Sequence, residues 1–164
     1  MSIDRNPTTG MIIDLLGPTI EFMTAPDDDE NDFCVMRGVV PPGGFVPLHS
    51  HSDTEGFVVV SGAVQVLRGD SDNPPEWLGA AAGDYVHMGG AAAHAWRNIG
   101  STPAIVLVVA TNRLGRFMRD AGRPVSEALT PPTPQDLARF AGAAANYGFW
   151  MADREQNAAV GITL

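Results

Sequence analysis

The sequence predicts a mainly β fold, a sandwich or barrel of short strands, followed by helices. Short runs rich in β-branched and aromatic residues recur along residues 11–110, and glycine or proline turns separate them. After residue 111 the apolar residues recur every three or four positions, which is the helical period. We therefore expect a single domain over residues 1–164, with a β-barrel at about 11–110 and a helical C-terminal extension at about 111–164.

The expected elements begin with residues 1–10, which hold few apolar side chains and should form a loose N-terminal arm. A strand at 33–40 ends at the Pro-Pro-Gly-Gly turn of residues 41–44, because proline presets φ and glycine tolerates positive φ. A strand that carries histidines begins next. The other expected strands lie near 12–16, 20–23, 56–60, 63–67, 77–82, 85–88, 95–98 and 105–110.

Two helices are expected in the extension. The first carries an apolar stripe at Leu114, Phe117, Met118 and Ala121, and should stop near residues 122–124. In the second, Thr133 has the features of an N-cap, with a proline and an acidic residue in the first turn. Its apolar stripe, expected to dock on the barrel or on a second subunit, is Leu137, Phe140, Ala141 and Ala144. An aromatic cluster at 147–151 should serve core or dimer packing.

Charge and composition exclude several classes of function. The net charge of −9 argues against nucleic-acid binding, which relies on clustered lysine and arginine. The acidic run at 27–32 lacks the glycine and distal glutamate of an EF-hand, so a solvated loop is favoured over a calcium site. The single cysteine, Cys34, cannot pair within the chain. Without a signal peptide or a membrane-spanning run, we expect a soluble, cytoplasmic protein with no membrane partner.

The four histidines, His49, His51, His87 and His94, all fall in the middle third of the chain. Because side chains alternate faces along a strand, His49 and His51 should point the same way, and Glu55 keeps that parity beyond a short turn. Neutral imidazoles with a carboxylate suit a borderline divalent metal and leave one side open for oxygen or substrate. His94 is a candidate fourth ligand.

These residues carry a resemblance to a protein family. The first cupin motif consists of a glycine, His-x-His, a glutamate and a second glycine, and every spacing is met. In this chain its residues are Gly43, His49, His51, Glu55 and Gly62. The second motif keeps Gly83, His94 and Asn98, but Gly89 and Ala91 replace the proline and the glycine of its turn. The chain thus resembles a single-domain cupin, loosely of the quercetinase-like kind.

The resemblance implies a double-stranded β-helix of two antiparallel sheets, with a metal near one end held by His49, His51, Glu55 and His94. Fe2+ is the favoured metal, and Zn2+, Ni2+ and Mn2+ are alternatives. The altered turn at 89–93 either weakens the preorganisation of His94 or leaves room beside the metal for a ligand, and we favour the second. Cupins commonly dimerise, and apolar residues on both faces of strand 56–60 agree with a homodimer.

Further site residues are weaker candidates. Glu55 and His87 are candidate catalytic residues. His87 shares parity with Tyr85, so if that face lines the barrel, His87 could act as an acid–base group, a substrate contact or an extra ligand. The alternative is a polar edge position or a hydrogen bond to a carbonyl. The candidate pocket residues, each equally suited to the core, are Phe57, Val59, Tyr85 and Trp96.

Three functions remain open at this point. The leading hypothesis is a metal-dependent oxidoreductase of the dioxygenase type that acts on a small organic molecule. The second keeps the metal without a redox step, as in cupin isomerases, cyclases and lyases. The third is a non-catalytic cupin that binds a small ligand.

Overall fold

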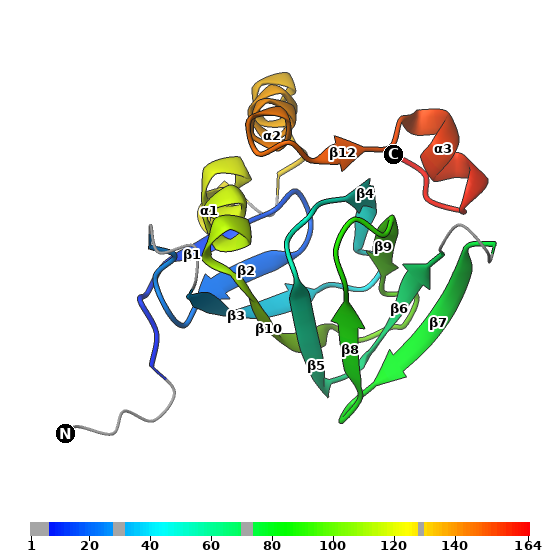
Figure 1. The fold of residues 1–164 in the computed structure, drawn as a ribbon, viewed down its shortest axis with the longest axis horizontal. Coiled ribbons are helices and arrows are strands. Elements are labelled where there is room, and N and C mark those ends of the chain that lie inside the picture. Colours follow the sequence, from blue (N-terminus) through cyan, green and yellow to red (C-terminus); the bar gives the residue numbers. More distant parts are fainter. Residues whose placement is uncertain (1–6, 28–31, 70–73, 128–129) are drawn as a thin grey trace.

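The computed structural model describes residues 7–27, 32–69, 74–127 and 130–164 (Figure 1). Residues 1–6 of the expected arm and residues 28–31 of the acidic run lie outside this described part. The end of the arm is tied to the barrel, because the backbone N–H of Thr9 donates to the carbonyl of Phe22 at 3.0 Å. None of the described helices has the length and apolar character needed to span a bilayer.

The strands form two sheets in which every pair of neighbours is antiparallel. The larger sheet has the order β11 (Arg123–Pro124), β1 (Ile12–Asp14), β2 (Thr19–Phe22), β3 (Phe33–Val40), β10 (Ala104–Thr111), β5 (Glu55–Ser61) and β8 (Tyr85–Met88). The smaller has the order β12 (Trp150–Met151), β4 (Phe45–Ser50), β9 (His94–Arg97), β6 (Ala63–Arg68) and β7 (Glu76–Ala81). The predicted mainly β architecture with C-terminal helices is confirmed.

The hydrophobic core fills the space between the two sheets. Burial alternates along β3 and β10, so every second side chain points inward. Across the core, the ring of Phe57 on β5 meets the ring of Trp96 on β9, with centroids 3.5 Å apart. Cys34 is also buried in this core and makes no disulfide. The interior of the barrel is therefore apolar. A polar side chain placed beside it needs a hydrogen-bond partner or a metal ion.

Three motif glycines stand where the backbone needs positive φ. Gly43, Gly62 and Gly83 have φ values of 74°, 72° and 95°, a region that side chains with a Cβ rarely adopt. The motif asparagine, Asn98, supports the first of these turns. Its backbone carbonyl accepts a hydrogen bond from the N–H of Gly43. Its buried amide also donates to the carbonyls of Val40 and Thr102. These residues fix the turns that set the strand register.

The helices follow the last long strand. Helix α1 (Asn112–Ala121) begins after the N-cap Thr111, and its end before Gly122 is as predicted. Helix α2 (Pro134–Asn146) has a capping box in which Thr133 and Asp136 each bond the other's backbone N–H. The short elements β11, β12, the 3₁₀ turn Val125–Glu127 and helix α3 (Arg154–Ala159) were not expected from the sequence. Figure 1 shows α1 and α2 together over one end of the barrel, with β12 leading from α2 toward α3.

Only part of the predicted apolar stripe of α2 is buried against the rest of the chain. Ala144 is buried and Phe140 half-buried, but Leu137 is 54% exposed and Ala141 is exposed. The reason is Asp136, which is buried and accepts a hydrogen bond from Nη1 of the buried Arg123 at 3.3 Å. Since successive residues are separated by about 100° around a helix, an inward Asp136 turns its neighbour Leu137 outward.

Candidate metal centre

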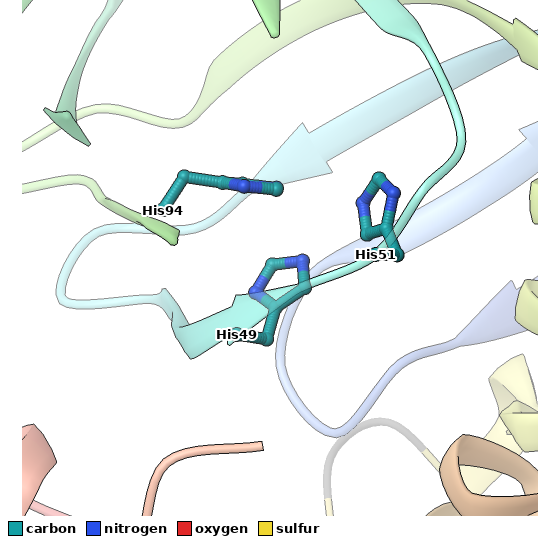
Figure 2. Close-up of side chains that lie close together, drawn as sticks. All are labelled: His49, His51 and His94. Carbon is teal, nitrogen blue, oxygen red and sulfur yellow. The ribbon is translucent and has the colours of Figure 1, made fainter. Parts of the chain in front are cut away.

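Three histidines converge at the end of the barrel near β4 and β9. His49 and His94 are paired directly across the two strands, and His51 lies just beyond the end of β4. Their ring centroids are 4.2 to 5.4 Å apart, and each offers a nitrogen within 4.8 Å of the others. Figure 2 shows the three rings turned toward one common space. Donor atoms at these separations could hold one metal ion.

Backbone carbonyls fix the orientation of all three rings. Because a carbonyl only accepts, Nδ1 must be the protonated nitrogen in each case. It donates from His49 to Pro47 at 2.8 Å, from His51 to Asp53 at 3.1 Å and from His94 to Ala92 at 2.8 Å. This tautomer leaves Nε2 with its lone pair free, which is the form that binds metals.

The free nitrogens are the strongest argument that a metal fits. Nε2 of His51 and Nε2 of His94 are buried and have no hydrogen-bond partner in the described part of the chain. A buried polar atom without a partner is costly, and native proteins rarely leave two of them side by side. A divalent cation would satisfy both atoms and also Nε2 of His49. The donor set therefore fits a borderline transition metal.

Glu55 lies beside the three histidines. Its Oε1 is 3.2 Å from Nε2 of His94, in a geometry that makes no hydrogen bond, and 4.0 Å from Nε2 of His51. Burial opposes ionisation of Glu55, but the interaction with His94 and then the attraction of His51 and His49, each in its protonated form, outweigh it and hold the pKa of Glu55 below its usual value. Glu55 is therefore a carboxylate near neutral pH, available as a fourth donor or as a base.

His49 and His51 are neutral near neutral pH. Burial, reinforced by the repulsion that a protonated His94 would exert, lowers the pKa of His49 to about 3. Burial also lowers the pKa of His51, against the attraction of Glu55. Neutral imidazoles are the form that a metal requires, so few protons would have to be displaced on binding.

The altered turn of the second motif is tied to the centre. Ala91 adopts φ 62° where the motif has a glycine, and its N–H donates to the carbonyl of His51 at 2.8 Å. The carbonyl of the following residue, Ala92, accepts a hydrogen bond from Nδ1 of His94. The turn thus bridges two candidate ligands. Its other surface, residues 90–93, faces a separate open groove that also includes Leu48 and Leu67. None of the four candidate ligands is among the residues that line this groove, so it is not the expected room beside the metal.

An apolar cavity of about 110 Å³ adjoins His49 and Glu55. Barrel residues line one side, and the C-terminal extension lines the other. The lining from the barrel is Leu15, Pro18, Ile20, Gly38, Val40, Val46, Pro47, His49, Glu55, Trp96, Val106 and Val108. The lining from the extension is Leu114, Phe117, Met118, Phe140, Phe149 and Met151.

Residues 36–110 match the sequence model of the family described as the Cupin domain. This span contains both histidine motifs and the strands that position the three converging rings. This span is a cupin domain. None of the curated proteins compared with it matches.

Solved structures share the cupin fold at low sequence identity. The polyketide cyclase RemF from Streptomyces resistomycificus has a TM-score of 0.55 and 18% identity, over 68% of this chain and 80% of that one. A mutant of Bacillus subtilis oxalate decarboxylase has a TM-score of 0.52 and 22% identity, over 62% of this chain. The match spans only 27% of that longer chain.

A third structure with the same fold is peruvianin-I, a cysteine peptidase from Thevetia peruviana latex. Its TM-score is 0.52 and its identity 19%, over 66% of this chain and 71% of that one. The three proteins are described by three different activities. Likeness at this level shows the fold, and the activity of this cupin must be argued from its own site.

The other predicted site residues of this cupin do not join the cavity as a group. Trp96 lines it, whereas Phe57 and Val59 are buried core residues that do not. Tyr85 is 64% exposed and His87 is exposed, 3.4 Å from Tyr85 through Nδ1. The condition for a role of His87 inside the barrel is not met, since Val86 and Met88 point inward, and His87 has the exposed edge position that was the alternative. His87 therefore cannot contact a ligand inside the cavity.

The sequence did not predict the residues that support the candidate ligands from outside the centre. Asp53 is buried and accepts from Thr111 at 2.6 Å and from the guanidinium of Arg113, which also donates to the carbonyl of Tyr147. Phe149 stacks on His51. Asp53 lies within the first motif, between its second histidine and its glutamate. An acidic residue at that position was the feature of the sequence that could have indicated its supporting role.

Proposed function

We propose that this cupin is a metal-dependent oxidoreductase of the dioxygenase type that acts on a small organic molecule. The metal would be held by Nε2 of His49, His51 and His94, with Glu55 as a further ligand, and Fe2+ is favoured. The observation that carries the proposal is the set of three imidazoles with Nδ1 bonded to a carbonyl and Nε2 free, beside an apolar cavity.

The protein's own residues have separable tasks in this proposal. A bound metal would supply a Lewis-acidic, redox-active centre for oxygen and for an enol or enediol group. Trp96, Phe117 and Phe149 would enclose the apolar body of the substrate and exclude water from it. The ionised Oε1 of Glu55 would accept the proton that a substrate hydroxyl loses, since Glu55 lines the cavity.

The alternative is a non-redox reaction of the isomerase, cyclase or lyase kind. It is favoured by one observation, the carboxylate of Glu55 on an otherwise apolar cavity wall, because a base in such a position can move a substrate proton without oxygen. A cupin that only binds its ligand would use the same cavity with no turnover.

The metal centre is tested by elemental analysis of protein purified without chelator. We expect about one metal per chain in the wild type and in His87→Ala, and a large loss in His49→Ala and His94→Ala. His87→Ala is the matched control because it removes an exposed histidine outside the centre. Equal metal content in all four proteins would contradict the proposal.

The redox step is tested with catechol, an enediol probe, under air after Fe2+ has been restored. Oxygen uptake by the wild type and by His87→Ala, and none by His94→Ala, is the expected result. Uptake that persists in His94→Ala would contradict the role of the centre. Conversion of the probe without oxygen uptake would instead support the non-redox alternative.

We further propose that the protein is a homodimer formed through the outer face of the larger sheet. Exposed apolar side chains from three neighbouring strands, Val58, Val60, Tyr85, Leu107 and Val109, support this arrangement. Val58 is paired directly with both Tyr85 and Leu107 across the strands, so these three side chains are continuous on that face.

A further inference from the structure

The cavity beside His49 and Glu55 is closed by the C-terminal extension. Leu114, Phe117 and Met118 reach it from α1, and Phe140 reaches it from α2. The barrel alone would leave this space open at its end, where α1 and α2 lie in Figure 1. The extension therefore supplies six of the eighteen residues that line a potential ligand site and decides the shape of that part.

The size of the cavity sets the size of a ligand. A buried apolar cavity of about 150 Å³ in another protein takes up benzene and stays free of water. The cavity here, of about 110 Å³, is slightly smaller and has a partly exposed rim at Leu15, Val46 and Met118. A molecule with one six-membered ring fits these limits, with a polar end that reaches toward the rim or toward His49.

The charge of the lining sets the charge of a ligand. Among the described residues, the lining contains no lysine or arginine, and its ionisable side chains are His49 and Glu55. The nearby guanidinium of Arg113 does not line the cavity and is engaged by Asp53 and by the carbonyl of Tyr147. A carboxylate placed in this cavity would lose its water and find no cationic side chain in this lining, which disfavours its binding.

We propose that the cavity is a binding site for an uncharged, apolar, single-ring molecule, and that the side chains of the C-terminal extension select it. The proposal deepens the proposed function, since it names the substrate class of the same centre. It does not need the metal for binding of the apolar body, because the contacts with α1, α2 and Phe149 are present without one. This separates the two proposals experimentally.

The test uses the full chain, stripped of metal with a chelator, and two probes of similar size. Acetophenone is neutral, and benzoate carries one negative charge. Saturation-transfer NMR and calorimetry should detect acetophenone binding, with benzoate at least 10-fold weaker. Benzoate binding equal to that of acetophenone, or no acetophenone binding at all, would overturn the proposal.

Two pairs of variants place the binding in the cavity. Val108→Phe adds volume inside it and should abolish acetophenone binding, whereas Val60→Phe makes the same change on the outer face, at a side chain 57% exposed, and should not. Should Val108→Phe fail to fold, Met118→Trp at the partly exposed rim replaces it. Equal acetophenone binding by the filled and the control variant would also overturn the proposal.

The second pair tests the charge selection. Met118→Lys adds a cation at the rim and should raise benzoate affinity at least 10-fold, while Leu137→Lys adds the same charge on the exposed face of α2 and should leave it unchanged. The same increase in both variants would show a long-range field and contradict selection by the lining. All these measurements use metal-free protein. Selective acetophenone binding can therefore be found even if elemental analysis finds no metal, and a metal can be found even if acetophenone does not bind.

Discussion

The ring of Phe149 stacks on the ring of His51, with centroids 4.9 Å apart and planes inclined by 30°. The same ring contacts Phe117 of α1, at a centroid distance of 4.3 Å. His51 is thus fixed by two features, the carbonyl of Asp53 at Nδ1 and an aromatic face from the extension. The helical extension and the candidate metal centre share one side chain.

Replacing Phe149 with leucine should weaken metal binding about 10-fold, because groups that orient a ligand typically contribute 10-fold to 100-fold to metal affinity. Competition with a chelating dye for Co2+ or Zn2+ measures the change. Phe140→Leu is the matched control, since Phe140 contacts Phe117 in the same cluster but lines the cavity away from His51. The same affinity in both variants would contradict a specific role for Phe149.

The metal-free protein should lose stability as the pH falls from about 6.5 toward 3. In this window an unfolded histidine takes up a proton, whereas His49, with its pKa lowered to about 3, does not. The unfolded state therefore binds more protons, and the free energy of unfolding rises with pH by at most about 1.4 kcal/mol per pH unit for each such histidine. The lowered pKa of His51 acts in the same direction.

Urea denaturation between pH 4 and pH 8, with chelator present, measures this dependence. His49→Gln should flatten the profile because the group with the lowered pKa is gone. His87→Gln should retain the wild-type slope, since that histidine is exposed. A wild-type slope in His49→Gln would show that the pH dependence arises elsewhere.

Arg123→Met should destabilise the protein by about 3 kcal/mol or more, because removal of one partner leaves buried charge uncompensated. Nε of Arg123 donates to the buried carboxylate of Asp14 at 2.7 Å, and Nη2 donates to the carbonyl of Thr130. The hydrogen bond to Asp14 is also the main reason that the pKa of Arg123 is raised. Thermal or urea unfolding measures the loss.

Arg139→Met is the control for this substitution. The side chain of Arg139 is 39% exposed and pairs at 2.8 Å with the buried carboxylate of Asp136. Because Asp136 keeps Arg123 as a partner, loss of the solvent-exposed Arg139 should cost about 1 kcal/mol or less. An equal loss of stability in the two variants would mean that the buried cluster does not hold α2 in place.

Val60→Asp should convert the proposed homodimer to a monomer, because it places a charge on the exposed apolar face. Light scattering measures the mass of the wild type and the variant at equal concentrations. Val125→Asp, at a side chain 41% exposed on the 3₁₀ turn, is the control and should leave the mass unchanged. A monomeric wild type would exclude the dimer directly.

The fold could be predicted from the sequence because its signals are local. The alternating apolar residues of β3 and the turn at 41–44 are each read within a few positions, and the structure has β3 at Phe33–Val40. The N-caps Thr111 and Thr133 follow from the same short-range logic, although only Thr133 was anticipated. Two-residue strands such as β11 carry too few residues for any periodic signal.

The candidate site could be predicted only where the motif spacing carries it. The convergence of His49 and His51 was expected from strand alternation, but β4 ends at Ser50, and a hydrogen bond from Ala91 fixes the chain beyond it. The inward face of β8 could not be decided, because Tyr85 and Val86 are both apolar enough to be buried. Phe149 was anticipated as core or interface, and its contact with His51 depends on long-range packing that no local pattern encodes.

β12 completes the smaller sheet beside the strand that carries His49. Met151 is paired with His49 and Trp150 with Ser50, so β4 has hydrogen-bonded neighbours on both sides. During synthesis, His49 leaves the ribosome long before residue 151, and until then β4 presents a row of unpaired backbone groups that invites pairing with another chain. Binding of metal by a nascent chain, or early protection of that edge by a chaperone, would therefore matter most in the interval before β12 is made.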